Sequence, residues 1–232
     1  MNRLVLPGIA LAGALVGGLV VWGTDRATDT ARVEAIVHDY ILEHPEILPQ
    51  AIQKLQERES GKAVAAVGSN ITKPYGSAVA GNPKGDVTLV EYFDYNCGYC
   101  RASLPLIDQM IARDPKLRVV FRDYPILAPS SAAAARASLV AAQQGKFAAF
   151  HKALYAAGPV SDATIAATLA ATGVDMARGD LTAADAEIAR NAADARALGM
   201  TGTPSWVVGD RMLTGALPVA ELEKAIAAAR GA

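Results

Sequence analysis

The two cysteines of this 232-residue chain stand three positions apart, in Cys97-Gly98-Tyr99-Cys100. A run of strand-forming residues, 87–93, precedes them, and a helical pattern follows. A C-x-x-C pair where a strand passes into a helix is typical of thiol–disulfide exchange, because both sulfurs then lie on the first helical turn. The unpaired N–H groups and positive dipole of the helix N-terminus favour a thiolate at Cys97, the form that attacks disulfides.

Other roles for the cysteine pair fit the sequence less well. A structural disulfide more often joins distant segments, because a short loop constrains the unfolded chain least. A zinc site needs four ligands, but there is no third cysteine, and His38, His44 and His151 lie far from the pair in sequence. A c-type haem site needs a histidine directly after the second cysteine, where this chain has Arg101. We therefore expect redox chemistry, with no metal ligands and no cofactor other than the redox-active disulfide itself.

The overall charge argues against a nucleic-acid partner. Lys and Arg number 22 and Asp and Glu number 23, which gives a formal net charge of −1. Proteins that bind nucleic acid neutralise phosphates with a basic surface, and this chain has no long basic run.

The N-terminal residues 1–24 are predicted to be a signal peptide or a membrane anchor. Arg3 precedes an uncharged, largely apolar run over residues 4–22. This run is long for the core of a signal peptide and just long enough to span a bilayer. We expect export from the cytosol, with the chain either soluble after cleavage or tethered by residues 4–22.

Residues 25–60 are predicted to form two amphipathic helices that mediate oligomerisation. The apolar face of the first helix carries Val33, Ile36, Val37, Tyr40 and Ile41, and that of the second carries Leu48, Ile52 and Leu55. Pro45 breaks the helical pattern between them, because proline disfavours helical geometry at the residue before it. Neither helix can bury its stripe alone, so we expect self-association, with docking onto the chain's own main domain as the alternative.

The Gly-, Ser- and Pro-containing residues 61–84 are predicted to be a linker, and residues 85–232 the main domain. Within that domain the pattern predicts, in order, strand 87–94, helix 101–113, strand 117–122, an alanine-rich stretch of about four helices over 131–199, strands 206–208 and 212–214, and helix 219–230. This order is that of an α/β thioredoxin-like fold with an inserted helical subdomain.

Two motifs together resemble the DsbA family of exported thiol oxidoreductases, namely the segment from Glu91 to Cys100 and Gly202-Thr203-Pro204. The resemblance covers residues from about 80 to 230. It implies that Cys97 is the nucleophile and Cys100 the resolving cysteine. It also implies that Pro204 is a cis-proline facing the pair, where it and Thr203 bind a client peptide. Glu91 matches the buried acid that relays a proton to or from the resolving thiol.

Residues from about 30 to 60 resemble the helical extension of the suppressor-of-copper-sensitivity protein C subgroup. In that subgroup the extension can assemble the protein into a trimer. The resemblance therefore implies a periplasmic homotrimer.

The residues between the cysteines predict the direction of exchange. Strong oxidases of the family carry Pro-His there, whereas this chain has Gly98-Tyr99, which lacks an imidazole to stabilise the thiolate. We expect a less acidic Cys97 and a less oxidising disulfide. Gly-Tyr, with Thr203 before the proline, resembles the oligomeric bacterial disulfide isomerases. The predicted function is disulfide isomerisation or reduction of misfolded or oxidised exported proteins, with a membrane redox partner that keeps the cysteines reduced.

Two other functions remain open on the sequence. One is a monomeric dithiol oxidase whose N-terminal helices dock on its own domain. The other is a copper-binding or copper-tolerance protein, since Cu(I) accepts soft thiolates and two can suffice.

Overall fold

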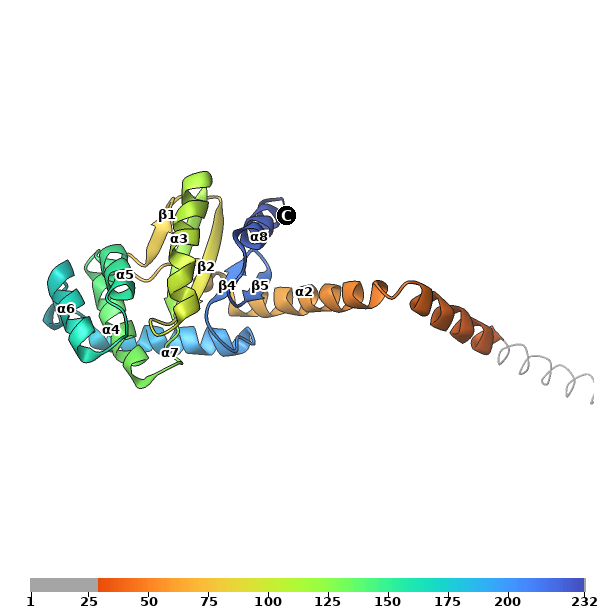
Figure 1. The fold of residues 1–232 in the computed structure, drawn as a ribbon, viewed down its shortest axis with the longest axis horizontal. Helices are drawn as coiled ribbons and strands as arrows, with labels where there is room; N and C mark the ends of the chain where they lie inside the picture. Colours follow the sequence, from red (N-terminus) through yellow and green to blue (C-terminus); the bar gives the residue numbers. More distant parts are fainter. Residues whose placement is uncertain (1–28, 232) are drawn as a thin grey trace, which may run out of the picture. The chain divides into compact units, whose positions relative to one another are not determined.

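The computed structural model describes residues 29–231 (Figure 1). The predicted signal peptide or anchor, 1–24, lies outside the described residues. No helix within 29–231 is long and apolar enough to cross a membrane.

A five-stranded mixed sheet, in the order β1-β3-β2-β4-β5, forms the centre of the main unit. Its strands are β1 Val79–Gly81, β2 Val87–Phe93, β3 Leu117–Asp123, β4 Ser205–Val208 and β5 Arg211–Thr214. The central strand β2 runs parallel to β3 and antiparallel to β4. All but one of its residues are buried, as expected for a strand rich in Val, Leu, Tyr and Phe with helices on both faces.

The helices of this unit agree with the predicted order. They are α3 Gly98–Arg113, α4 Pro129–Gln143, α5 Phe147–Ala156, α6 Asp162–Thr172, α7 Leu181–Ala197 and α8 Val219–Arg230, with short 3-10 turns at Ser69–Thr72 and Met176–Arg178. Four of them, α4 to α7, are inserted between β3 and β4, and Figure 1 shows α4, α5 and α6 grouped beside the sheet. This confirms the predicted thioredoxin-like fold with a helical insertion.

Alternation along β2 divides the apolar core into two parts. Leu89 and Phe93 point to one face of the sheet, where they join side chains of α3, α5 and α8. Val90 and Tyr92 point to the other face, where they join side chains of α7 and the residues around the first 3-10 turn. Because successive strand residues face opposite sides, Glu91 shares the face of Leu89 and Phe93. That face is the one on which α3 lies.

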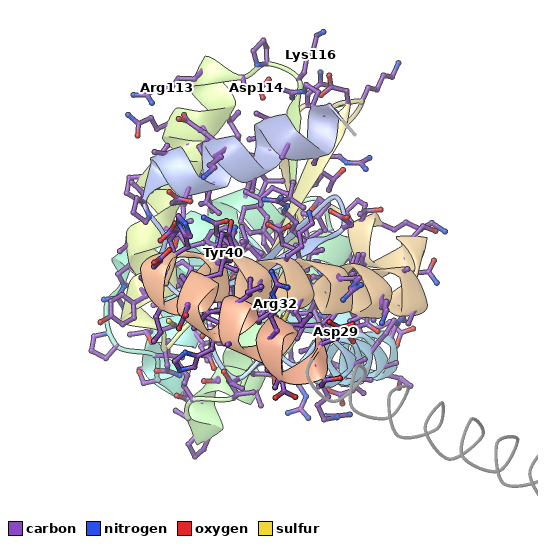
Figure 2. The ribbon with its side chains drawn as sticks, turned by 90° about the vertical axis from the view of Figure 1, so that its right-hand side faces the viewer. Asp29, Arg32, Tyr40, Arg113, Asp114 and Lys116 are labelled. Atoms are coloured by element: carbon purple, nitrogen blue, oxygen red, sulfur yellow. The ribbon has the colours of Figure 1, made fainter. Side chains whose placement is uncertain are left out.

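Ion pairs connect the C-terminal end of α3 to neighbouring elements. Figure 2 labels Arg113, Asp114 and Lys116, which lie where α3 passes into β3. Arg230 of α8 donates to the Asp114 carboxylate at 2.8 Å and to Asp86 at 2.8 Å. These pairs are exposed and contribute little stability each, but they join α8 to the start of the α3–β3 connection at Asp114 and to Asp86, the residue before β2.

The predicted linker over 61–84 is wrong in its secondary structure. Helix α2 runs without interruption from Ile47 to Val67, the first 3-10 turn follows, and β1 is an edge strand of the sheet. The chain divides into two compact units at residues 55 and 56, so the second half of α2 belongs to the main unit and the boundary predicted at 85 is also wrong. Helix α2 continues past Gly61 because of tertiary packing. Val64 and Val67 pack against the part of the core that contains Val90 and Tyr92, and this contact outweighs the low helix propensity of Gly61.

The first unit contains a helix over 29–43 and the first turns of α2. The break at His44 and Pro45 is confirmed, and Pro49 lies in the first turn of α2, where proline is tolerated. The stripe side chains Val33, Ile36, Val37, Tyr40, Leu48, Ile52 and Leu55 are between 49% and 57% exposed, and Ile41 is partly buried. Within the described chain the apolar stripe is therefore uncovered.

Candidate active site

The C-x-x-C motif forms the first turn of α3. The helix begins at Gly98, three residues earlier than predicted, and Cys97 is its N-cap residue with extended backbone. The Cys97 sulfur accepts a hydrogen bond from the backbone N–H of Cys100, with a distance of 3.4 Å. This is the position at which an oxygen-bearing side chain usually caps a helix, so a thiolate here satisfies one of the unpaired N–H groups. Gly98 and Tyr99 are exposed, Tyr99 by 68%.

The second motif faces the first, as the resemblance implied. The Thr203–Pro204 peptide bond is cis, and it directly precedes β4, the antiparallel neighbour of β2. The carbonyl oxygen of Thr203 lies 3.2 Å from the Cys97 sulfur, which donates to it when protonated. Residues 201–205, with Thr214 and Gly215, line an open groove of about 240 Å³.

The environment of Cys97 favours the thiolate. The pKa of its thiol is lowered from 9.0 to about 5, first by the hydrogen bond from the Cys100 thiol, against an opposing effect of burial. The Thr203 side chain and the backbone N–H groups of Cys100 and Tyr99 lower it further. The sequence lacks a histidine at this position, and the structure obtains an acidic thiol from these other donors.

Cys100 has the opposite character. Its side chain is 1% exposed, and burial raises the pKa of its thiol well above the ordinary value. The hydrogen bond to Cys97 and the Glu91 carboxylate raise it further. Both cysteines are free thiols, so the ionisable Cys97 lies beside a thiol that keeps its proton.

Glu91 is buried on β2 beneath the cysteine pair, with 1% of its surface exposed. Its neighbours across the strands are Phe121 on β3 and Trp206 on β4, both buried. Burial raises the pKa of its carboxyl well above the usual value, and the charge of Cys97 adds to this effect. One carboxyl oxygen has no hydrogen-bond partner in the described chain. An apolar site of this kind can hold a carboxyl proton near neutral pH.

Sequence reasoning missed Asp94, which lies three residues before Cys97 and is 2% exposed. Its carboxylate accepts four hydrogen bonds, from the backbone N–H groups of Asn96, Ile126 and Leu127 and from the Ser131 hydroxyl. The available signal was a charged residue inside the motif, directly after a buried strand. Nothing in the spacing indicated that residues 126–131 would lie beside it.

Metal-binding geometry is absent from the described part of the chain, where no group of three or more His, Cys, Asp or Glu side chains could hold an ion. The oligomerisation residues predicted on the stripe lie in the first unit and the cysteines in the second.

Two family models match this chain. A family model described as a DSBA-like thioredoxin domain matches residues 88–227, and one described as the copper resistance protein ScsC N-terminal domain matches residues 29–60. Among solved structures, a thioredoxin-like oxidoreductase from Silicibacter pomeroyi is 40% identical, with a TM-score of 0.64 over 70% of this chain and 96% of that one.

Solved structures of ScsC also resemble this chain. Proteus mirabilis ScsC in a transitional conformation is 29% identical, with a TM-score of 0.67 over 88% of this chain and 98% of that one. A curated protein, the Na(+)/H(+) antiporter NhaA 1 of Salinispora arenicola, is 28% identical over 65% of this chain but only 24% of its own length. This chain thus spans about a quarter of the length of that curated relative.

The matched residues 88–227 contain every candidate site residue described above, and the site holds the C-x-x-C pair on the first turn of a helix. The chain therefore belongs to the DSBA-like thioredoxin-domain family, as a thiol–disulfide oxidoreductase of the DsbA/ScsC type.

Proposed function

We propose that this protein is an exported disulfide isomerase or reductase that acts on misfolded or oxidised proteins in the periplasm. The observation that carries the proposal is the surroundings of Cys97, whose sulfur accepts from the backbone N–H of Cys100 at 3.4 Å, while Gly98 and Tyr99 between the cysteines carry no imidazole. Its hydrogen-bond donors lower the pKa of the Cys97 thiol, so that the thiolate can attack client disulfides. Without an imidazole to stabilise it further, Cys97 is a poorer leaving group than the nucleophile of a strong oxidase, which supports shuffling over one-way oxidation.

The proposed cycle begins with the Cys97 thiolate attacking a client disulfide. One client sulfur joins Cys97 in a mixed disulfide, and the other leaves as a thiolate. When a client thiolate attacks the client sulfur of the mixed disulfide, Cys97 leaves and the client disulfide is rearranged with no net change in oxidation.

The same intermediate can end in reduction. Cys100 then loses its proton to Glu91 in the ionised form of that residue and attacks the Cys97 sulfur, which releases a reduced client and leaves the Cys97–Cys100 disulfide. A membrane-bound dithiol partner must return two electrons to that disulfide. The burial of Glu91 supports its role as the proton acceptor, because a raised pKa matches it better to a thiol.

We further propose that the N-terminal helices assemble the catalytic units, as a homotrimer. Their exposed stripe, and the match of residues 29–60 to the ScsC N-terminal domain, support this assembly. When several catalytic units face one client, the effective concentration of Cys97 thiolate available for a second attack on that client is higher.

A refolding assay on a client with scrambled disulfides tests the direction of exchange. We expect Cys97→Ser to lose all activity. Cys100→Ser should still rearrange the client, because the rearranging step does not use Cys100, but it should lose both the oxidation of dithiol clients and the reduction of disulfide clients. If the unmodified protein oxidises reduced clients rapidly and leaves scrambled clients unchanged, the monomeric oxidase is the better assignment.

Cu(I) binding is a second candidate, favoured by the description of the family that matches residues 29–60. Cys97 and Cys100 would be the soft ligands, but burial raises the pKa of Cys100, which disfavours the thiolate that Cu(I) prefers. Titration of the reduced protein with Cu(I) alone, compared with Cys97→Ser, tests it. Stoichiometric binding that Cys97→Ser abolishes would support this candidate, and equal binding by both proteins would contradict it.

A further inference from the structure

Asp94 connects three segments that meet at the cysteine pair. Its carboxylate is almost fully buried, and both oxygens are occupied. One accepts from the Asn96 N–H at 2.8 Å and the Ser131 hydroxyl at 2.7 Å, and the other from the N–H groups of Ile126 and Leu127 at 2.8 and 2.9 Å. These four donors match the acceptor capacity of a carboxylate, so a replacement that cannot accept them leaves buried donors unpaired.

The backbone of Asp94 contacts the site directly. Its carbonyl oxygen accepts from the Cys97 N–H at 2.9 Å and from the Tyr155 hydroxyl at 3.0 Å. A hydrogen bond with the Asp94 backbone also lowers the pKa of Cys100, against the larger effect of burial. The same residue thus fixes the turn that ends in Cys97 from two sides, through its main chain and its carboxylate.

The carboxylate also secures the start of the helical insertion. Ile126 and Leu127 directly precede α4, and Ser131 is in its first turn, where its hydroxyl accepts from the Ala128 N–H at 3.2 Å. The Asn96 side chain donates to that hydroxyl at 2.9 Å. These hydrogen bonds join residues 126–131 to residues 94–97.

We propose that Asp94 is a positioning residue for thiol–disulfide exchange, which holds Cys97 at the hydrogen-bonding distances that stabilise its thiolate. The distance at stake is the 3.4 Å from the Cys97 sulfur to the Cys100 backbone nitrogen, whose N–H donates to that sulfur. This role concerns exchange by Cys97 and does not depend on whether isomerisation, reduction or oxidation is the main activity.

The direction in which the pH titration of Cys97 moves when Asp94 is replaced separates positioning from a simple effect of charge. If Asp94 acted only through its negative charge, its removal would ease ionisation of Cys97 and move the thiol titration to lower pH. If Asp94 positions Cys97, its removal weakens the donors to the thiolate and moves the titration to higher pH.

The test is the pH titration of Cys97 in the reduced full chain, followed by thiolate absorbance and by the rate of alkylation. We expect Asp94→Asn to raise the midpoint by about one pH unit, so that about tenfold less thiolate is present well below the midpoint. Glu187→Gln is the matched control, because Glu187 is also 2% exposed but pairs with Arg122, on the sheet face away from the cysteines. It should destabilise the protein and leave the titration unchanged.

A gentler variant keeps the test decisive if Asp94→Asn does not fold. Ser131→Ala removes one of the four donors and should shift the Cys97 midpoint upward by a smaller amount. An unchanged or lowered midpoint in the folded variants would overturn the proposal, as would an equal upward shift in Glu187→Gln.

Discussion

Cys97 and Cys100 occupy the same helical turn but different environments. Cys97 caps α3 next to the exposed Gly98 and Tyr99, while Cys100 faces Glu91 and the buried side of the sheet. The Cys100 thiol donates to the Cys97 sulfur, so one residue's retained proton stabilises the other's charge. This division fits exchange chemistry, in which the first thiol must be ionised and the second must wait for a mixed disulfide.

The first prediction at the scale of single residues concerns the pH dependence of Cys97. Its alkylation rate should be nearly constant above pH 6 and should fall about tenfold per unit well below pH 5, because only the thiolate reacts. Cys100→Ala should move the midpoint upward, since it removes the donor with the largest effect. Cys100→Ser keeps a hydroxyl donor and should move it less. Equal midpoints in the two variants would contradict the role of the Cys100 thiol.

The buried Glu91 carboxyl should make the free energy of unfolding depend on pH. A carboxyl whose pKa is raised by folding contributes stability below its unfolded pKa of about 4.5, and this contribution is lost as pH rises toward the folded value. Glu91→Gln does not titrate, so its free energy of unfolding relative to the unmodified protein should rise with pH above about 4.5. This difference in the free energy of unfolding should grow by up to about 1.4 kcal/mol per pH unit. Urea unfolding between pH 4 and 8 measures it, and a difference that is independent of pH would contradict it.

At the scale of helices and strands, the sequence predicted the elements whose pattern is local. The strand 87–93 and the motif that follows it were predictable from apolar content and spacing. Helix α2 was not, because Gly61 and Gly68 favoured a linker, whereas the contacts that extend the helix come from β5 and from the core of the main unit. Asp94 was missed for the same reason, since three of its four donors lie more than 30 residues away.

Helix α2 protects the edge of the sheet. Strand β5 pairs with β4 on one side only, and on the other side the Ser60 hydroxyl of α2 accepts from the Met212 N–H at 2.7 Å. Glu57 of the same helix pairs with Arg211 at 3.3 Å. A covered edge strand cannot pair with another chain.

This contact predicts the effect of removing one hydroxyl. Ser60→Ala should lower the free energy of unfolding by about 1–2 kcal/mol, because it leaves a partly buried N–H of β5 unpaired. Chemical denaturation measures the change, and hydrogen exchange at Met212 should accelerate. Ser69→Ala is the control, since that side chain is exposed and should cost nothing measurable. Equal stability of both variants would show that α2 does not secure β5.

At the scale of the whole molecule, the uncovered stripe of the first unit predicts assembly. For the chain without residues 1–24, we expect sedimentation to give the mass of a trimer. Ile36→Asp combined with Tyr40→Asp should reduce that mass about threefold, because charges replace two side chains that are 57% and 53% exposed in the single chain.

Leu42→Asp is the matched control for assembly. Leu42 is 67% exposed on the same helix, but helical geometry puts it on the side opposite Val33, away from the stripe. It should leave the mass unchanged. The stripe variant should also lose rearrangement of scrambled clients while its Cys97 alkylation rate stays the same, because the cysteines lie in the other unit. A monomeric unmodified protein, or equal loss of mass in both variants, would contradict the assembly and favour the oxidase.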